Sequence, residues 1–278
     1  MRNLMVNPVL NKEFKLRFRT VKSFLGILFY LITLGIIIVG FIFMQSMSNN
    51  QGYVRPSQSR EMFMMLSFLQ LALVLFITPG LTAGVISSER ERQTLNILLT
   101  TTESSTSIIL SKLVSSVSFL LLLIVASLPL YSIVFLYGGI SPGQVLTMLG
   151  LYVFTILVYG SLGVLFSTLL RKTIVSIVTT YGVTMFLAGG TAFLTIILMS
   201  LNQGFNGSPV VNPAPYFVAM FNPPVVLYSF FVPDFMAHFT KTTGIEFPLW
   251  AAFIICNTVI FIAAVLFSIK KLRPNMKG

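Results

Sequence analysis

Side chains that could do chemistry are few in this sequence, and they form no catalytic pattern. His238 is the only histidine and Cys256 the only cysteine, so a thiol metal site and a disulfide framework are excluded. No apolar stretch holds the serine–histidine pair, paired aspartates or zinc ligands that proteolysis inside a membrane requires. The phosphate-binding pattern G-x-x-x-x-G-K-[ST] is absent, because no glycine precedes a lysine. We therefore expect no catalytic residue, no metal site and no directly bound cofactor.

The segment at 87–112 differs from the other charged segments, which are mainly basic. It mixes acids with bases, at Glu89, Arg90, Glu91, Arg92 and Glu103. Because the inner leaflet of a membrane is itself negative, a segment lying on lipid would lack these acids. The mixture favours contact with a protein partner, and a solvated charged turn remains the alternative.

The same segment is expected to contain a short helix. Ser88 and Glu91 have the spacing of a capping box, in which a hydroxyl and a carboxylate satisfy the first free N–H groups. Leu95, Leu98 and Leu99 would give the following turn an apolar edge.

The segment at 87–112 connects two stretches that we predict to be membrane spans. Hydrophobic residues make up 55% of the 278 residues and charged residues 9%, far below the roughly one quarter typical of soluble domains. No charge occurs at 23–54, 62–88, 113–170 or 173–233. Apolar runs of about 20 residues are typical of spanning helices. We predict an all-α integral membrane protein with spans at 24–44, 62–86, 113–137, 144–170, 173–199 and 249–269.

The basic residues predict the orientation of these spans. With both termini in the cytoplasm, the inner segments hold all but three of the 18 lysines and arginines, the exceptions being Arg55, Arg60 and Lys241. This placement at span ends also argues against nucleic acid as the partner of a chain with net charge +11. An uncharged stretch at 214–232 could suggest a seventh span. Pro223 and Pro224 interrupt it, so we expect short helices within an outer segment at 200–248.

The residues before the first span predict a helix at 7–22 lying along the inner membrane surface. Asn7 is a candidate N-cap, with Pro8 at the first helical position. Basic residues recur at helical spacing on one face, and apolar residues recur on another. The basic face contains Lys12, Lys15, Arg19 and Lys22, and the apolar face contains Leu10, Phe14, Phe18 and Val21.

Two stretches resemble the type-2 ABC transporter permeases, the membrane subunits of ATP-binding-cassette exporters. They are NPVLNKEFKLRFR before the first span and ITPGLTAGVISSERERQTLNILLTTTESSTSIILSKL from span two into span three. The family pattern is matched at Glu89, Glu91, Thr94, Leu95, Leu98, Leu99 and Lys112. The chain departs from it at Gln93, where glycine is common, at Asn96, where glutamate is common, and at Thr102, near the usual proline. The six-span layout and the long outer segment are also similar.

The resemblance implies a function that the residues alone do not. The whole chain, 1–278, would be one permease domain forming half of a translocation pathway. The helix at 7–22 would be the elbow helix, and the segment at 87–112 would contain the coupling helix that contacts a separate ATPase through Glu89, Glu91, Arg92, Thr94, Leu95, Leu98 and Leu99. That partner would bind ATP and magnesium, and a second permease subunit would complete the pathway.

Three kinds of function remain open at this point. The first is an ABC exporter subunit in the cell membrane of a bacterium. The second is a membrane anchor or sensor of an ATPase complex, and the third is the substrate-capturing subunit of an importer. The substrate is not indicated, although spans without charge favour lipophilic or amphipathic cargo.

Overall fold

The computed structural model describes residues 8–19, 21–48, 56–95, 104–136, 141–201 and 211–272. These residues form helices joined by turns, with no strand among them. Six helical stretches in the described part are long and apolar enough to cross a membrane, which confirms the all-α prediction with six spans. They are Phe24–Met44, Ser59–Glu91, Ser105–Ser132, Pro142–Leu169, Thr173–Leu201 and Leu249–Leu272.

The chain divides into two compact units. One comprises Met1–Ile77 and Glu103–Ile156, and the other comprises Thr78–Thr102 and Leu157–Gly278. Two helices, α3 (Pro56–Thr82) and α7 (Pro142–Leu169), begin in the first unit and end in the second. The boundary in α3 falls beside Pro79, which lacks the N–H that would bond to the preceding turn.

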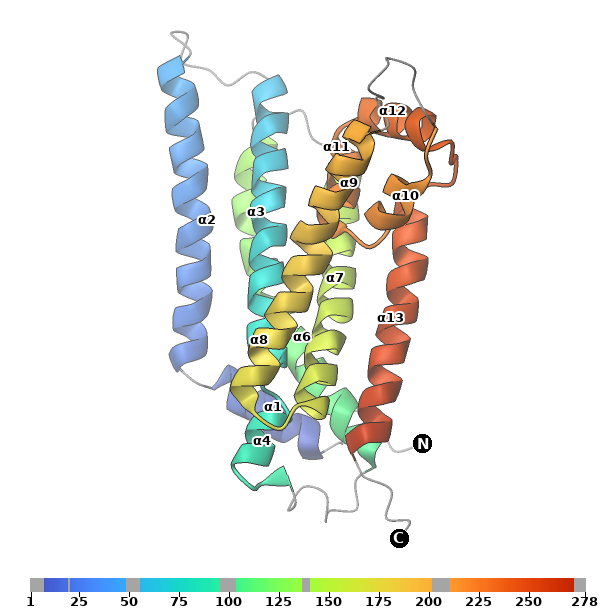
Figure 1. Cartoon of the computed structure of the whole chain (residues 1–278). Coiled ribbons are helices and arrows are strands. Elements are labelled where there is room, and N and C mark those ends of the chain that lie inside the picture. Colours follow the sequence, from blue (N-terminus) through green and yellow to red (C-terminus); the bar gives the residue numbers. More distant parts are fainter. Residues whose placement is uncertain are drawn as a thin grey trace. The chain divides into compact units, whose positions relative to one another are not determined.

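The first unit contains α1 (Pro8–Phe18), α2 (Val21–Ser48) and α6 (Ser105–Leu136), together with the first parts of α3 and α7. In Figure 1, α1 lies at one end of α2 and turns away from its axis. The apolar face of α1 packs on α6, with the rings of Phe18 and Phe119 centred 5.9 Å apart. Helix α1 begins at Pro8, as expected, and ends four residues earlier than predicted, so Lys22 belongs to α2. The candidate N-cap Asn7 lies outside the described residues.

Helix α6 begins at Ser105, eight residues before the predicted start of span three at 113. The hydroxyl of Ser104 accepts a hydrogen bond from the N–H of Ser107 and so caps the helix. The sequence-based boundary was placed after Lys112 because a charge was expected to lie outside the apolar run. Lys112 instead lies within the helix and is 2% exposed, with its Nζ 3.0 Å from Oε1 of Glu13.

The second unit contains α4 (Ser87–Glu91), α8 (Thr173–Met185), α9 (Thr191–Leu201) and α13 (Leu249–Leu272). The fifth span, predicted as one run at 173–199, consists of α8 and α9 joined by one π-helical turn, η2 (Phe186–Gly190). Such a turn widens the backbone and leaves carbonyl groups without their usual partners.

The outer segment folds into three short helices, α10 (Ala214–Ala219), α11 (Pro223–Phe231) and α12 (Pro233–Thr243). No single helix covers 214–232, as the two prolines predicted. Figure 1 shows these helices gathered at one end of α9 and α13, and α4 at the other end of α8. The Tyr216 hydroxyl donates to the carbonyl of Phe247 at 2.9 Å, and burial raises the pKa of this phenol.

Asn222 joins the outer segment to the π-helical turn. Its Oδ1 accepts from the N–H of Val225 at 2.8 Å and caps α11. Its Nδ2 donates to the carbonyl of Ala188 at 2.6 Å and to Oγ1 of Thr191 at 2.7 Å. One buried amide therefore satisfies both a helix start and the backbone of η2.

Candidate functional site

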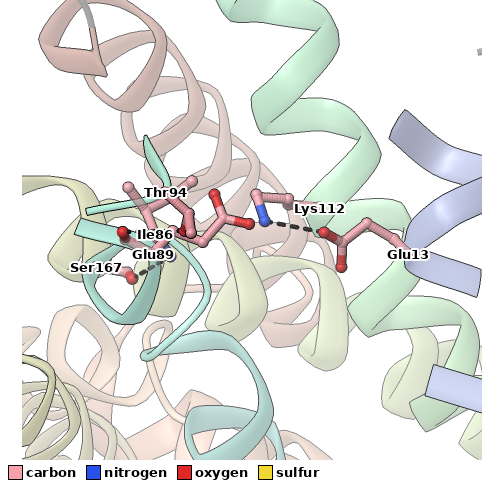
Figure 2. Close-up of polar contacts among 6 residues, drawn as sticks. All are labelled: Glu13, Ile86, Glu89, Thr94, Lys112 and Ser167. Atoms are coloured by element: carbon pink, nitrogen blue, oxygen red, sulfur yellow. Dashed lines mark hydrogen bonds and ion pairs between the residues drawn. The ribbon is translucent and has the colours of Figure 1, made fainter. Parts of the chain in front are cut away.

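The segment after α3 is the candidate site, and it folds back against the end of α7. Helix α3 ends at Thr82, four turn residues follow, and α4 begins at Ser87. The N–H groups of Ile86 and Ser87 both donate to Oγ of Ser167, at 2.8 and 2.9 Å (Figure 2). This hydroxyl lies 80 positions away in the chain, and it satisfies the donors at the start of a helix.

The predicted capping box at Ser88 and Glu91 is wrong. Ser88 lies inside α4, the residue preceding the helix is Ile86, and no side chain of the segment itself caps it. The physical reason is that the helical bonding starts before Ser88: its own N–H already donates to the carbonyl of Gly84, so Ser88 lies within the helix and not at its start. Glu91 is consequently available for another contact.

Two oppositely charged side chains fasten α4 to the turn between α7 and α8. Arg90 donates through Nη2 to the carbonyl of Thr168 at 3.1 Å, and through Nη1 to that of Leu170 at 3.5 Å. Oε1 of Glu91 accepts from the N–H of Thr173 at 2.8 Å. A cation at a helix C-terminus and an anion at a helix N-terminus are each favoured by the helix dipole. The charges therefore hold the ends of two long helices together.

Close contacts in the preceding turn complete this attachment. Oγ of Ser176, in α8, donates to the carbonyl of Ala83 at 2.6 Å. Gly163, in α7, faces Thr82 so closely that an added Cβ would lie 1.9 Å from its Oγ1. The segment from Thr82 to Glu91 is thus bonded to α7 and to α8.

Helix α4 ends in an exposed charged turn. The N–H of Gln93 donates to the carbonyl of Arg90, and the N–H of Thr94 donates to that of Glu89, at 3.1 and 3.0 Å. This pair of bonds is a Schellman motif, and Gln93 has the left-handed conformation that the motif requires, with φ of 58°. Figure 2 shows Thr94 folded back over Glu89. Glu91, Arg92, Gln93 and Thr94 are exposed; we call these four residues the α4 turn.

The structure sorts the predicted contact residues into three groups. Arg92 and Thr94 are exposed, and Glu91 is exposed while bonded to Thr173. Glu89 is half-buried. Leu95 is 5% exposed, so its side chain packs inside the protein and is not available for contact with a partner. Leu98 and Leu99 lie outside the described residues.

Helix α1 carries part of the two faces that the periodicity indicated, but Val21, predicted on the apolar face, lies in α2 and is 74% exposed. Lys12, Lys15 and Arg19 are exposed, whereas Phe14 and Phe18 are half-buried with ring centroids 5.7 Å apart. The apolar face contacts α6, so protein as well as lipid covers it.

Sequence reasoning missed the residues that hold the site in place. Ser167 and Thr173 are ordinary hydroxyl residues of apolar helices, and no local pattern marks them. Glu13 has a clearer signal in the sequence, because it is the only acid in the basic helix α1. In the structure it pairs with Lys112 (Figure 2). Within the described residues, no group of three histidine, cysteine or acidic side chains is arranged to bind a metal ion.

Comparison of the sequence with models of protein families and with curated proteins gave no match.

Proposed function

We propose that this chain is the permease subunit of an ABC exporter, forming half of a pathway that separate ATPase subunits drive. The observation that carries the proposal is the attachment of α4 to the ends of α7 and α8. Movement of the α4 turn by a bound partner would be passed to both helices through Ser167, Arg90 and Glu91. Rigid helices linked by specific bonds are the physical means by which such movement is transmitted.

The chemistry of the α4 turn supports a protein as the partner. An acid, a base, an amide and a hydroxyl stand exposed next to one another, in place of the uniformly basic surface that anionic lipid would attract. The partner would bind ATP and magnesium, and two permease subunits, identical or related, would pair with two ATPase subunits.

The membrane placement follows from the same proposal. The six spans and the positive charge at 8–22, 90–112, 171–172 and 270–277 favour both termini in the cytoplasm, with the chain in the cell membrane of a bacterium. Helices α10 to α12 would then face the outside. Transport would run outward, by alternation of the two halves of the dimer.

Co-purification with a charge-reversed variant tests the proposal. The tagged chain is isolated in mild detergent from its source cells, and retained ATPases are identified by their phosphate-binding loop. Arg92→Glu should reduce the retained ATPase by on the order of tenfold, equivalent to about 1.4 kcal/mol. Lys241→Glu is the matched control, since Lys241 is an exposed base at the end of α12. It should retain the ATPase at the level of the unchanged chain.

The outcomes separate the alternatives. If the unchanged chain retains no ATPase, the proposal fails. If Arg92→Glu retains as much ATPase as Lys241→Glu, the α4 turn is not the contact. Retention of an ATPase without ATP-dependent flux in vesicles would indicate an anchor or sensor. A small molecule that stays bound through purification without the ATPase would indicate an importer subunit.

A further inference from the structure

Helix α1 exposes three basic side chains on one of its faces. Lys12, Lys15 and Arg19 recur at intervals of three and four residues, the spacing of neighbours on a helix surface. Arg19 follows the last residue of α1, and its N–H still donates to the carbonyl of Lys15 at 3.2 Å, so the helical spacing extends to it. All three side chains are exposed, over a length of about 10 Å along the helix. We call these three residues the α1 bases.

Glu13, the only acid of α1, does not offset the charge of the α1 bases. Its Oε1 lies 3.0 Å from Nζ of Lys112 in α6 (Figure 2). The Glu13 side chain is 17% exposed and that of Lys112 is 2% exposed, so the two opposite charges neutralise each other inside the first unit. Among the side chains of α1 that the structure describes, the exposed charge is therefore positive only.

The opposite face of α1 is occupied by protein. Phe14 and Phe18 are half-buried, and the ring of Phe18 packs near that of Phe119 in α6, with the centroids 5.9 Å apart. A helix that inserts into a membrane surface does so through an apolar face of this kind. Since α6 already contacts that face, α1 offers its charges to the membrane in preference to its apolar side chains.

The α1 bases lie next to the lipid-facing surface of α2. Val21, Phe24 and Leu25 are 74%, 64% and 58% exposed, and the first membrane span begins at Phe24. Exposed apolar side chains of a spanning helix face lipid tails. Bases that come just before such residues in the chain, on a helix that turns away from the span axis, lie at the level of the lipid headgroups (Figure 1).

We propose that the α1 bases bind the headgroups of acidic phospholipids, such as phosphatidylglycerol, in the leaflet that surrounds this end of α2. Ammonium and guanidinium groups form charge-assisted hydrogen bonds with phosphate oxygens. A zwitterionic headgroup carries a cation of its own, so acidic lipid is preferred. Lipid suits this surface better than a protein partner does, because no exposed acid stands among the α1 bases, in contrast to the α4 turn. The inference is independent of the proposed function, since binding of lipid requires no ATPase.

Native mass spectrometry of the full-length chain provides the test. The chain in a non-ionic detergent is titrated with phosphatidylglycerol, or with phosphatidylcholine of the same acyl chains, and the bound lipid molecules are counted. Each of the α1 bases should contribute about fivefold to the affinity for the acidic lipid. The unchanged chain should therefore bind phosphatidylglycerol at much lower concentration than phosphatidylcholine.

Two double variants of equal charge provide the decisive comparison. Lys12→Gln/Lys15→Gln should lower the affinity for phosphatidylglycerol by about 25-fold and leave that for phosphatidylcholine unchanged. Lys270→Gln/Lys271→Gln is the matched control, because it removes two exposed bases at the end of α13. Its affinity for phosphatidylglycerol should stay within about twofold of the unchanged chain, since neither base lies on α1. Arg19→Gln is a milder second variant with an expected loss of about fivefold.

Three results would overturn the proposal. The first is equal affinity of the unchanged chain for the two lipids. The second is an equal loss of phosphatidylglycerol binding in the two double variants, which would indicate general attraction between a positive chain and acidic lipid. The third is displacement of phosphatidylglycerol by inorganic phosphate at the same concentration, which would identify the ligand as a free anion. Full lipid binding by Lys12→Gln/Lys15→Gln together with loss of its retained ATPase would equally refute it, and would assign the α1 bases to a protein partner.

Discussion

Replacement of Gly163 by alanine should disturb the attachment of the α4 segment at its closest point. A Cβ on Gly163 would lie 1.9 Å from Oγ1 and 2.8 Å from Cβ of Thr82, and 3.3 Å from the backbone nitrogen of Ala83. The hydroxyl of Thr82 donates to the carbonyl of Thr78 at 2.8 Å, so turning it away gives up that bond. The Cβ and the backbone cannot turn away, so the end of α3 must move from α7.

The expected loss of stability follows from three contributions. Overpacking of this kind costs about 1–3 kcal/mol. Displacement of the adjoining turn would weaken the bonds from Ile86 and Ser87 to Ser167, at about 1 kcal/mol each. Alanine regains about 1 kcal/mol of helix propensity over glycine. The net effect is a loss of about 2–4 kcal/mol, or a fall in Tm of about 3–7 °C for a chain of this size.

Gly150→Ala is the matched control, because Gly150 lies in the same helix and an added Cβ would meet nothing within 4 Å. Thermal unfolding of both variants in one detergent is the assay. Gly150→Ala should match or exceed the unchanged chain, whereas Gly163→Ala should fall below it. Equal Tm values for the two variants would show that α3 and α7 do not approach each other at Thr82.

Two further predictions concern single backbone and side-chain contacts. Gln93→Gly should raise stability by about 1 kcal/mol in thermal unfolding, because the left-handed conformation costs a residue with a Cβ that amount; a fall in Tm would contradict the Schellman ending of α4. Asn222→Asp should keep the cap of Val225 but place a carboxylate against the carbonyl of Ala188. We expect hydrogen exchange to accelerate at η2 and to stay unchanged at α11, and acceleration at both would refute the separate bonding of the two amide atoms.

The spans could be predicted because their signal is local. Charge-free apolar runs of sufficient length identify spanning helices wherever they occur, and the two prolines at 223 and 224 ruled out a seventh. Helix ends were predicted less well where a charge was taken as a boundary. Lys112 lies inside α6 because Glu13 of α1 pairs with it, and 99 positions separate the two residues.

The candidate site also combines features that the sequence indicates with features that it does not. A short helix near residue 90 was predicted, but from a capping box that does not form and from leucines that follow α4, which is only Ser87–Glu91. The group that accepts hydrogen bonds at the start of this helix was not predictable, because it is a hydroxyl of α7 that no pattern near the helix specifies. The positive φ of Gln93 had an indirect signal: the permeases that this segment resembles commonly have glycine at this position, and glycine adopts this conformation without steric cost.

The sequence suggested that the charges of the segment form one surface, but the structure gives them different contacts. Arg90 and Glu91 bond to the ends of α7 and α8, so reversing Glu91 would loosen the helices before it altered any contact with a partner. Arg92 is exposed beyond them, at the point where α4 turns back. Among the charged residues of the segment, a change at Arg92 would therefore separate the proposed partner binding from attachment. A loss of the ATPase with Glu91→Lys and not with Arg92→Glu would show that attachment, and not recognition, was disturbed.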